Sequence, residues 1–194
     1  LRDFSSTPLN TFTVGIGYNP DMHFNSDYVY DEGSKTDIFG FDDGYREFPL
    51  PRGIDIPLPE RGDANSLVVT NYTESVDKNL NVSNKNSSPN LTLGFTSSNS
   101  YDLKNERKVG YMASLNYRSN ISYFDDYLES RYEKSLPAFA NTVYNTGRLG
   151  KDERFISFLG GIAYGSKKGK QKVNFLFIQN GESTAIQGDF LNNG

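Results

Sequence analysis

The sequence contains no cysteine, no tryptophan and only one histidine in 194 residues. Without cysteine there is no disulfide, no thiolate-bound zinc and no thiol nucleophile. The single histidine, His23, cannot supply a pair of imidazole ligands, and no Gly-x-Ser-x-Gly motif accompanies it. No run of 18 apolar residues is present, so no transmembrane helix is expected. A net charge of −4 and a pI near 5.1 leave no basic surface for nucleic acid.

The residues that are abundant favour β-structure. Tyrosine (13) and phenylalanine (14) provide most of the large apolar side chains, and glycine (18) is common, whereas only 36% of all residues are hydrophobic. The mean hydropathy is −0.61. Aromatic residues on a polar background suit strands with one apolar face and many turns, and do not suit a helical bundle.

Five segments alternate apolar with polar or small residues, which is the pattern of a strand with one apolar face. In the first, Phe12, Val14 and Ile16 alternate with threonine and glycine. The last two segments carry apolar residues at both odd and even positions, so the pattern does not decide which of their faces is the apolar one. The five segments are residues 10–18, 91–96, 109–118, 156–164 and 173–177.

The connections between these segments alternate between long and short. Residues 19–90 and 119–152 are predicted as long loops, whereas residues 98–106 and 165–170 read as short connections. Compact soluble domains mostly have connections of about 4–6 residues. Outer-membrane β-barrels combine short periplasmic turns with long extracellular loops, although a soluble β-sandwich shares the strand alternation.

A short helix is predicted within the first long loop, over residues 66–80. Val68, Tyr72, Val76 and Leu80 recur at every fourth position, and Asn65 or Ser66 is the candidate N-cap. The expected fold is therefore all-β, with about five antiparallel strands of an outer-membrane β-barrel, and residues 1–194 form one partial barrel region.

No set of residues has the arrangement of an active site, so we expect no enzyme and no cofactor. Four aspartates crowd the glycine- and proline-rich part of the first long loop, namely Asp37, Asp42, Asp43 and Asp55. Their oxygens make Asp37, Asp42 and Asp43 weak candidates for calcium, but their spacing matches no EF-hand, and capping of turns is the preferred interpretation. The neighbouring Asp125 and Asp126 do not flank a bond as glycosidase carboxylates must.

Four segments resemble a known family. Residues 17–25 (GYNPDMHFN) and 35–46 (KTDIFGFDDGYR) look like TonB-dependent receptors of Bacteroidota, of the type with a carboxypeptidase-like regulatory domain before the plug. Residues 78–80 and 179–183 are similar to later stretches of the same proteins. The resemblance spans nearly the whole chain, and its motifs are signatures of the family rather than catalytic motifs.

The resemblance implies a function in active nutrient uptake across the bacterial outer membrane. It implies a plugged barrel of about 22 strands, of which this chain is expected to form the first part. The implied partners are the plug and the remaining barrel of the same polypeptide, TonB, a surface lipoprotein and the lipid bilayer. Candidate ligand-facing residues are Phe39, Asp42, Asp43, Tyr45 and Arg46. The alternative is a secreted or surface β-sandwich that binds glycans.

Overall fold

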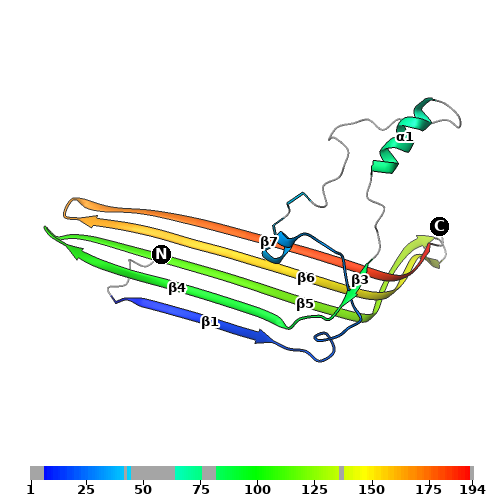
Figure 1. The fold of residues 1–194 in the computed structure, drawn as a ribbon, viewed down its shortest axis with the longest axis horizontal. Helices are drawn as coiled ribbons and strands as arrows, with labels where there is room; N and C mark the ends of the chain where they lie inside the picture. The colour runs from blue at the N-terminus through cyan, green and yellow to red at the C-terminus, as the bar shows by residue number, and fades with distance from the viewer. Residues whose placement is uncertain (1–6, 42, 45–63, 76–81, 136–137, 193–194) are drawn as a thin grey trace. The chain divides into compact units, whose positions relative to one another are not determined.

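A computed structural model describes residues 7–41, 43–44, 64–75, 82–135 and 138–192 (Figure 1). The chain divides into two compact units, one formed by residues 1–41 and 82–194 and the other by residues 42–81. In the smaller unit the helix α1 spans Ala64–Ser75, so the prediction of a helix is confirmed. It begins before Asn65 and Ser66, so neither is its N-cap, and the last residues of the predicted helix lie outside the described residues.

The larger unit is built on one antiparallel sheet of five strands, in the order β1-β4-β5-β6-β7. This confirms the predicted all-β fold. Its edge strands are β1 and β7, and the sheet is not closed. The strands are β1 (Leu9–Gly17), β4 (Asn90–Leu103), β5 (Arg107–Ser135), β6 (Ala138–Ser166) and β7 (Gly169–Asn192).

Two short turns close the hairpins at one end of the sheet. Strand β6 passes into β7 through a two-residue turn between Ser166 and Gly169. Strand β4 passes into β5 through three residues, of which Asn105 and Glu106 have φ of 63° and 55°. The Lys167 ammonium lies 2.8 Å from the Glu106 carboxylate and joins the two turns. Both connections were predicted to be short.

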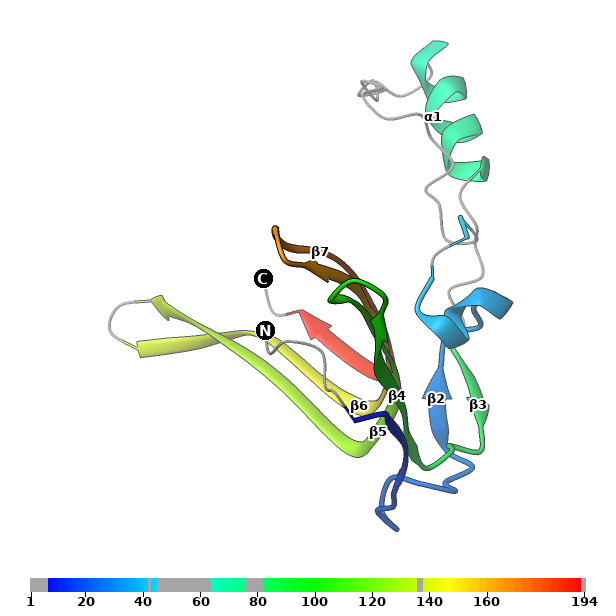
Figure 2. The ribbon, with the colours of Figure 1, turned by 90° about the vertical axis from the view of Figure 1, so that its left-hand side faces the viewer.

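The prediction that residues 119–152 form a second long loop is wrong. Strands β5 and β6 continue through it as one hairpin, paired from Ser119↔Arg154 to Ser135↔Ala138. The register shifts between Phe124 and Tyr127, where β5 carries one extra residue, and again between Arg131 and Tyr132. Such bulges bend a strand pair. We call residues 119–135 of β5 with residues 138–154 of β6 the distal hairpin, and it bends away from the rest of the sheet (Figure 2). Backbone pairing does not require apolar alternation, which is why the sequence pattern did not reveal these strands.

The first predicted long loop, residues 19–90, also contains ordered structure. Strand β2 (Tyr28–Tyr30) pairs with β3 (Ser83–Lys85), and a 3-10 helix, η1, spans Lys35–Phe39. We call residues 19–41 with 83–87 the strap. The strap lies against one face of the five-stranded sheet (Figure 2), where Tyr28 and Val29 are fully buried with Ile121 and Tyr123.

Candidate functional site

The pairing register gathers the apolar side chains of all five strands on one face of the sheet. Directly paired residues share a face. One row runs without interruption from Phe12 through Phe95, Leu115 and Phe158 to Phe177. We call the apolar part of this face the belt. Its apolar members are Phe12, Val14, Ile16, Leu91, Leu93, Phe95, Tyr101, Val109, Tyr111, Ala113, Leu115, Tyr117, Ile156, Phe158, Ile162, Tyr164, Val173, Phe175 and Phe177.

Much of the belt is exposed. The exposed fraction is 70% for Phe12, 63% for Ile162 and 73% for Val173, on strands at both edges and within the sheet. Single exposed apolar residues are common, but soluble monomers rarely expose contiguous apolar patches above a few hundred Å². A continuous surface across five strands is therefore the mark of an interaction face.

The belt is also free of charge over a defined length. On this face of β5, no charged residue occurs from 109 to 117, and the same holds from 156 to 164 on β6 and from 171 to 179 on β7. The first charges on this face are Arg107 beside the short turns, and Arg154 and Asp152 on the far side. On β6 these nine residues match the roughly 9–11 that a tilted strand needs to cross a bilayer. On the same face β5 carries no charge as far as Tyr123, and β7 none as far as Gln187.

The opposite face is polar or small over most of its width. Thr96 and Ser114 share a hydrogen bond of 3.0 Å, and the Asn116 amide donates to the Ser157 hydroxyl at 3.3 Å. The register also settles the face of the last two strands. Leu176 and Ile178 point away from the belt, because they pair with Leu159 and Ser157.

Contacts around η1 fix the strap to the edge of the belt that lies farthest from the two short turns. We call this edge, the row of Tyr117, Ile156 and Gln179, the rim. The Tyr117 hydroxyl donates to the Ile38 carbonyl at 2.9 Å, and the Gln179 amide donates to the Gly40 carbonyl at 2.6 Å. The Phe41 ring stacks on Phe177 with 6.1 Å between ring centroids. Gly40 has φ of 72°, and its hypothetical Cβ would lie 3.0 Å from the Gly181 nitrogen. A glycine is therefore required for this close approach.

Beyond the rim, the strap covers a polar cluster around Asp152. The Arg154 guanidinium donates to Asp152 Oδ2 at 2.7 Å, whereas buried Oδ1 has no hydrogen-bond partner among the described residues. Burial raises the pKa of Asp152, although Arg154 and then Lys85 oppose the rise. Burial also raises the pKa of Tyr28 and lowers that of Lys85. Asp152 on β6 interacts electrostatically with Lys85 and Tyr28, which belong to the strap, so the cluster links the strap to the sheet.

His23 also fixes the strap. Its buried ring accepts a hydrogen bond at Nδ1 from the Asn19 N–H at 2.8 Å. The network therefore assigns the proton to Nε2, which lies 3.2 Å from the Ile121 carbonyl oxygen of β5 and donates to it. The histidine has a structural role here, linking the strap to the same strand that contributes to the belt.

The predicted site residues are only partly within the described chain. Phe39 ends η1 at the rim of the belt and is half exposed, whereas Asp42, Tyr45 and Arg46 lie outside the described residues. Asp37 accepts a hydrogen bond from the Ser34 hydroxyl at 3.3 Å. Within the described ranges, which include Asp43, no three acidic or histidine side chains converge on a common point. Asp42 and Asp55 fall outside those ranges, so the calcium site stays a prediction.

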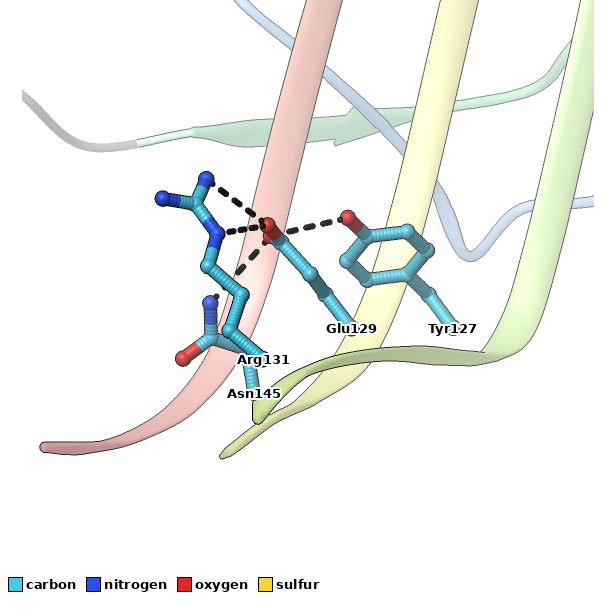
Figure 3. Close-up of polar contacts among 4 residues, drawn as sticks. All are labelled: Tyr127, Glu129, Arg131 and Asn145. Atoms are coloured by element: carbon cyan, nitrogen blue, oxygen red, sulfur yellow. Dashed lines mark hydrogen bonds and ion pairs between the residues drawn. The ribbon is translucent and has the colours of Figure 1, made fainter. Parts of the chain in front are cut away.

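Sequence reasoning missed a cluster of four side chains on the distal hairpin (Figure 3). Glu129 Oε1 accepts from the Arg131 guanidinium at 3.1 and 3.2 Å, and Oε2 accepts from the Tyr127 hydroxyl at 3.2 Å and the Asn145 amide at 3.4 Å. These hydrogen bonds, that of Arg131 first, lower the pKa of Glu129. The spacing of Tyr127, Glu129 and Arg131 places them on one face of a strand. This spacing could have predicted the cluster only if residues 119–152 had been known to form a hairpin.

No protein-family model matches this chain, and comparisons with curated proteins and with solved structures likewise find no match. Among the residues that the structure describes, no helix is long and apolar enough to cross a membrane.

Proposed function

We propose that this chain is part of the wall of a bacterial outer-membrane β-barrel, within a TonB-dependent receptor that takes up a nutrient. The observation that carries the proposal is the charge-free, exposed belt that runs in register across all five strands. Lipid is the partner that such a surface fits, because hydrocarbon has no hydrogen-bonding groups and covers apolar side chains without specific contacts.

The remaining features agree with this assignment. Apolar residues outside and small or polar residues inside are the arrangement of a barrel that encloses a polar interior. In this arrangement the short β4–β5 and β6–β7 turns lie on the periplasmic side, and the strap and distal hairpin lie outside the cell. The resemblance of residues 17–25 and 35–46 to Bacteroidota receptors supports the same function.

The proposal requires further parts of the same polypeptide. Unpaired strand edges are not viable in lipid, so other strands must pair with β1 and β7 until the barrel closes. A plug in the lumen and TonB on the periplasmic side would complete the transporter, and a surface lipoprotein would be a partner outside. The five strands hold no catalytic role in this proposal, and they transport nothing alone.

The test is fractionation of the cells that make the protein, followed by immunoblotting with an antibody against residues 19–90. We expect a heat-modifiable band much larger than 21.8 kDa in the outer membrane, and loss of that band when intact cells are treated with protease. A soluble band would contradict the proposal. It would favour a surface or secreted β-sandwich that binds glycans, in which the belt is covered by protein.

A further inference from the structure

Residues 38–41 of the strap, which we call its tip, carry apolar side chains where the belt meets its first charged residues. Ile38 is 53% exposed and Phe39 is 50% exposed, and both belong to the five-residue helix η1. Next to them Phe41 is partly exposed, with its ring stacked on Phe177 of the belt. Three large apolar side chains within four residues of a surface turn need a partner, since polar residues are the usual occupants of such turns.

The position of this tip along the strands is defined by its contacts. Gly40 accepts a hydrogen bond from Gln179, which lies in the last charge-free row of the belt. The hypothetical Cβ of Gly40 would also lie 3.4 Å from the carbonyl oxygen of Arg154, which pairs with Gly181 in the next row and is charged. The tip therefore lies at the boundary between the charge-free and charged parts of the same face.

The side of the sheet on which the tip lies decides between two partners. A ligand passing through the barrel would meet the polar face, which carries Thr96, Ser114 and Asn116. The tip contacts Tyr117, Phe177 and Gln179, which are all on the belt face. Phe39 is therefore on the outer side of the proposed wall, and the expectation that it faces the ligand does not fit this geometry.

We infer that η1, with Ile38, Phe39 and Phe41, is an anchor that inserts into the interfacial layer of the outer leaflet. This inference rests on the proposed function, because it takes the belt as the lipid-facing surface and extends it by one turn of the strap. Apolar and aromatic side chains at the headgroup level penetrate about 5–10 Å into the boundary with the acyl chains. Lys35, exposed at the start of η1, suits the phosphate of a headgroup.

The anchor also explains why the strap is tied so closely to the sheet. Hydrogen bonds from Tyr117 and Gln179 hold the carbonyl of Ile38 in η1 and that of its C-cap Gly40, while the side chains of Ile38 and Phe39 remain about half exposed. A rigid turn fixed in this way sets the depth of the barrel wall in the membrane, because its tip cannot enter the hydrocarbon beyond the two rows that carry the charged Arg154 and Asp152.

The test is the depth of nitroxide labels on single cysteines, and this chain has no cysteine of its own. Phe39→Cys is compared with Leu115→Cys in the centre of the belt and with Asp27→Cys on the strap, whose carboxylate lies 3.9 Å from Arg148 beyond the rim. Ile38→Cys is a second probe of the tip. Each variant is made in the whole protein as its host produces it, in outer membranes, and the parent protein labelled in the same way gives the background. Collision with oxygen reports lipid, and collision with a water-soluble nickel chelate reports solvent.

We expect the label at 39 to collide more with oxygen than with the chelate, at a depth between those at 115 and 27. A label at 39 as accessible to the chelate as that at 27, with 115 deep in lipid, overturns the anchor and leaves the proposed function standing. A label at 39 that neither reagent reaches also overturns it, and identifies a protein as the cover. If the label at 115 is itself in water, the proposed function fails and the anchor fails with it.

Discussion

The carbonyl oxygen of Val29 in the strap lies directly over Gly150 of β6, in the space that a Cβ on Gly150 would occupy. The hypothetical Cβ would also lie 3.1 Å from the Tyr28 ring. Both strap residues are fully buried. The absence of a side chain at position 150 is therefore what allows β2 to pack on the sheet.

Gly150→Ala is expected to detach β2 from β6. Overpacking of a filled contact costs about 1–3 kcal/mol, and here the atom in the way is backbone, which cannot move aside alone. Hydrogen exchange at the amides of β2 should become faster by a corresponding factor. The control is Gly165→Ala on the same strand, where the nearest atom would be 3.8 Å away; equal exchange in the two variants would contradict the packing described.

Leu115 and Asn116 are neighbours on β5 that face opposite sides of the sheet, and they form a matched pair for the belt. Leu115→Arg places a charge in the centre of the belt, which costs about 2–4 kcal/mol at the midplane of a bilayer. We expect a large loss of the heat-modifiable, membrane-assembled form. Asn116→Arg should assemble at nearly the parent level, because the polar face already carries Arg118 nearby. Comparable losses would count against lipid contact.

Asp152 predicts a pH dependence of strap docking. Burial raises its pKa above the ordinary aspartate value, so the folded arrangement is favoured while the carboxyl is protonated and loses this contribution as pH rises through the raised pKa. The groups around it are Arg154 on β6, Lys85 on β3, Tyr28 on β2 and Asp37 on η1. Exchange at the β2 amides, corrected for intrinsic rates, should show greater protection at low pH.

Asp152→Asn should flatten this pH dependence, whatever its effect on the absolute level of protection. The level itself changes for a second reason, since the variant leaves the Arg154 guanidinium without its carboxylate. Asp27→Asn, at an exposed position on the strap, is the control and should keep the parent slope. An unchanged slope in the Asp152 variant would assign the effect to another group.

Glu129 predicts a pH dependence of the opposite sign in the distal hairpin. Its pKa is lowered by hydrogen bonds from Arg131, Tyr127 and Asn145, so its contribution is present above the ordinary glutamate pKa and is lost as pH falls through the lowered value. The hairpin amides around Glu129 should therefore lose protection in acid. Glu129→Gln should remove the effect, whereas Glu133→Gln, exposed on the same strand, should not.

The parts of the fold that could be predicted are those that produce a pattern among residues close together in the sequence. Phe12, Val14 and Ile16 alternate with small residues and mark β1, and Lys167 and Lys168 mark a tight turn. The face of β7 could not be predicted, because Val173 and Leu176 are both apolar and only pairing with Ile162 and Leu159 separates them.

The strap could not be predicted for a different reason. Strands β2 and β3 have three residues each and pair across more than fifty positions, so no local periodicity describes them. The run Tyr28-Val29-Tyr30 is the one signal, since aromatic and β-branched residues favour strands. Phe39 was predicted from its segment as a ligand-facing candidate, but only the contacts of Gly40 and Phe41 show on which side of the sheet this turn lies.

The most direct test of the belt as a lipid-facing surface is a cysteine scan of β5 from position 109 to 118, in the whole protein in outer membranes. A water-soluble maleimide is added first, and a lipid-soluble one second. We predict a period of two: Gly110, Ser114, Asn116 and Arg118 positions react with the first reagent, and Val109, Tyr111, Ala113 and Leu115 positions react with the second alone. Reaction of the belt positions with the water-soluble reagent, or the absence of any alternation, would contradict the account.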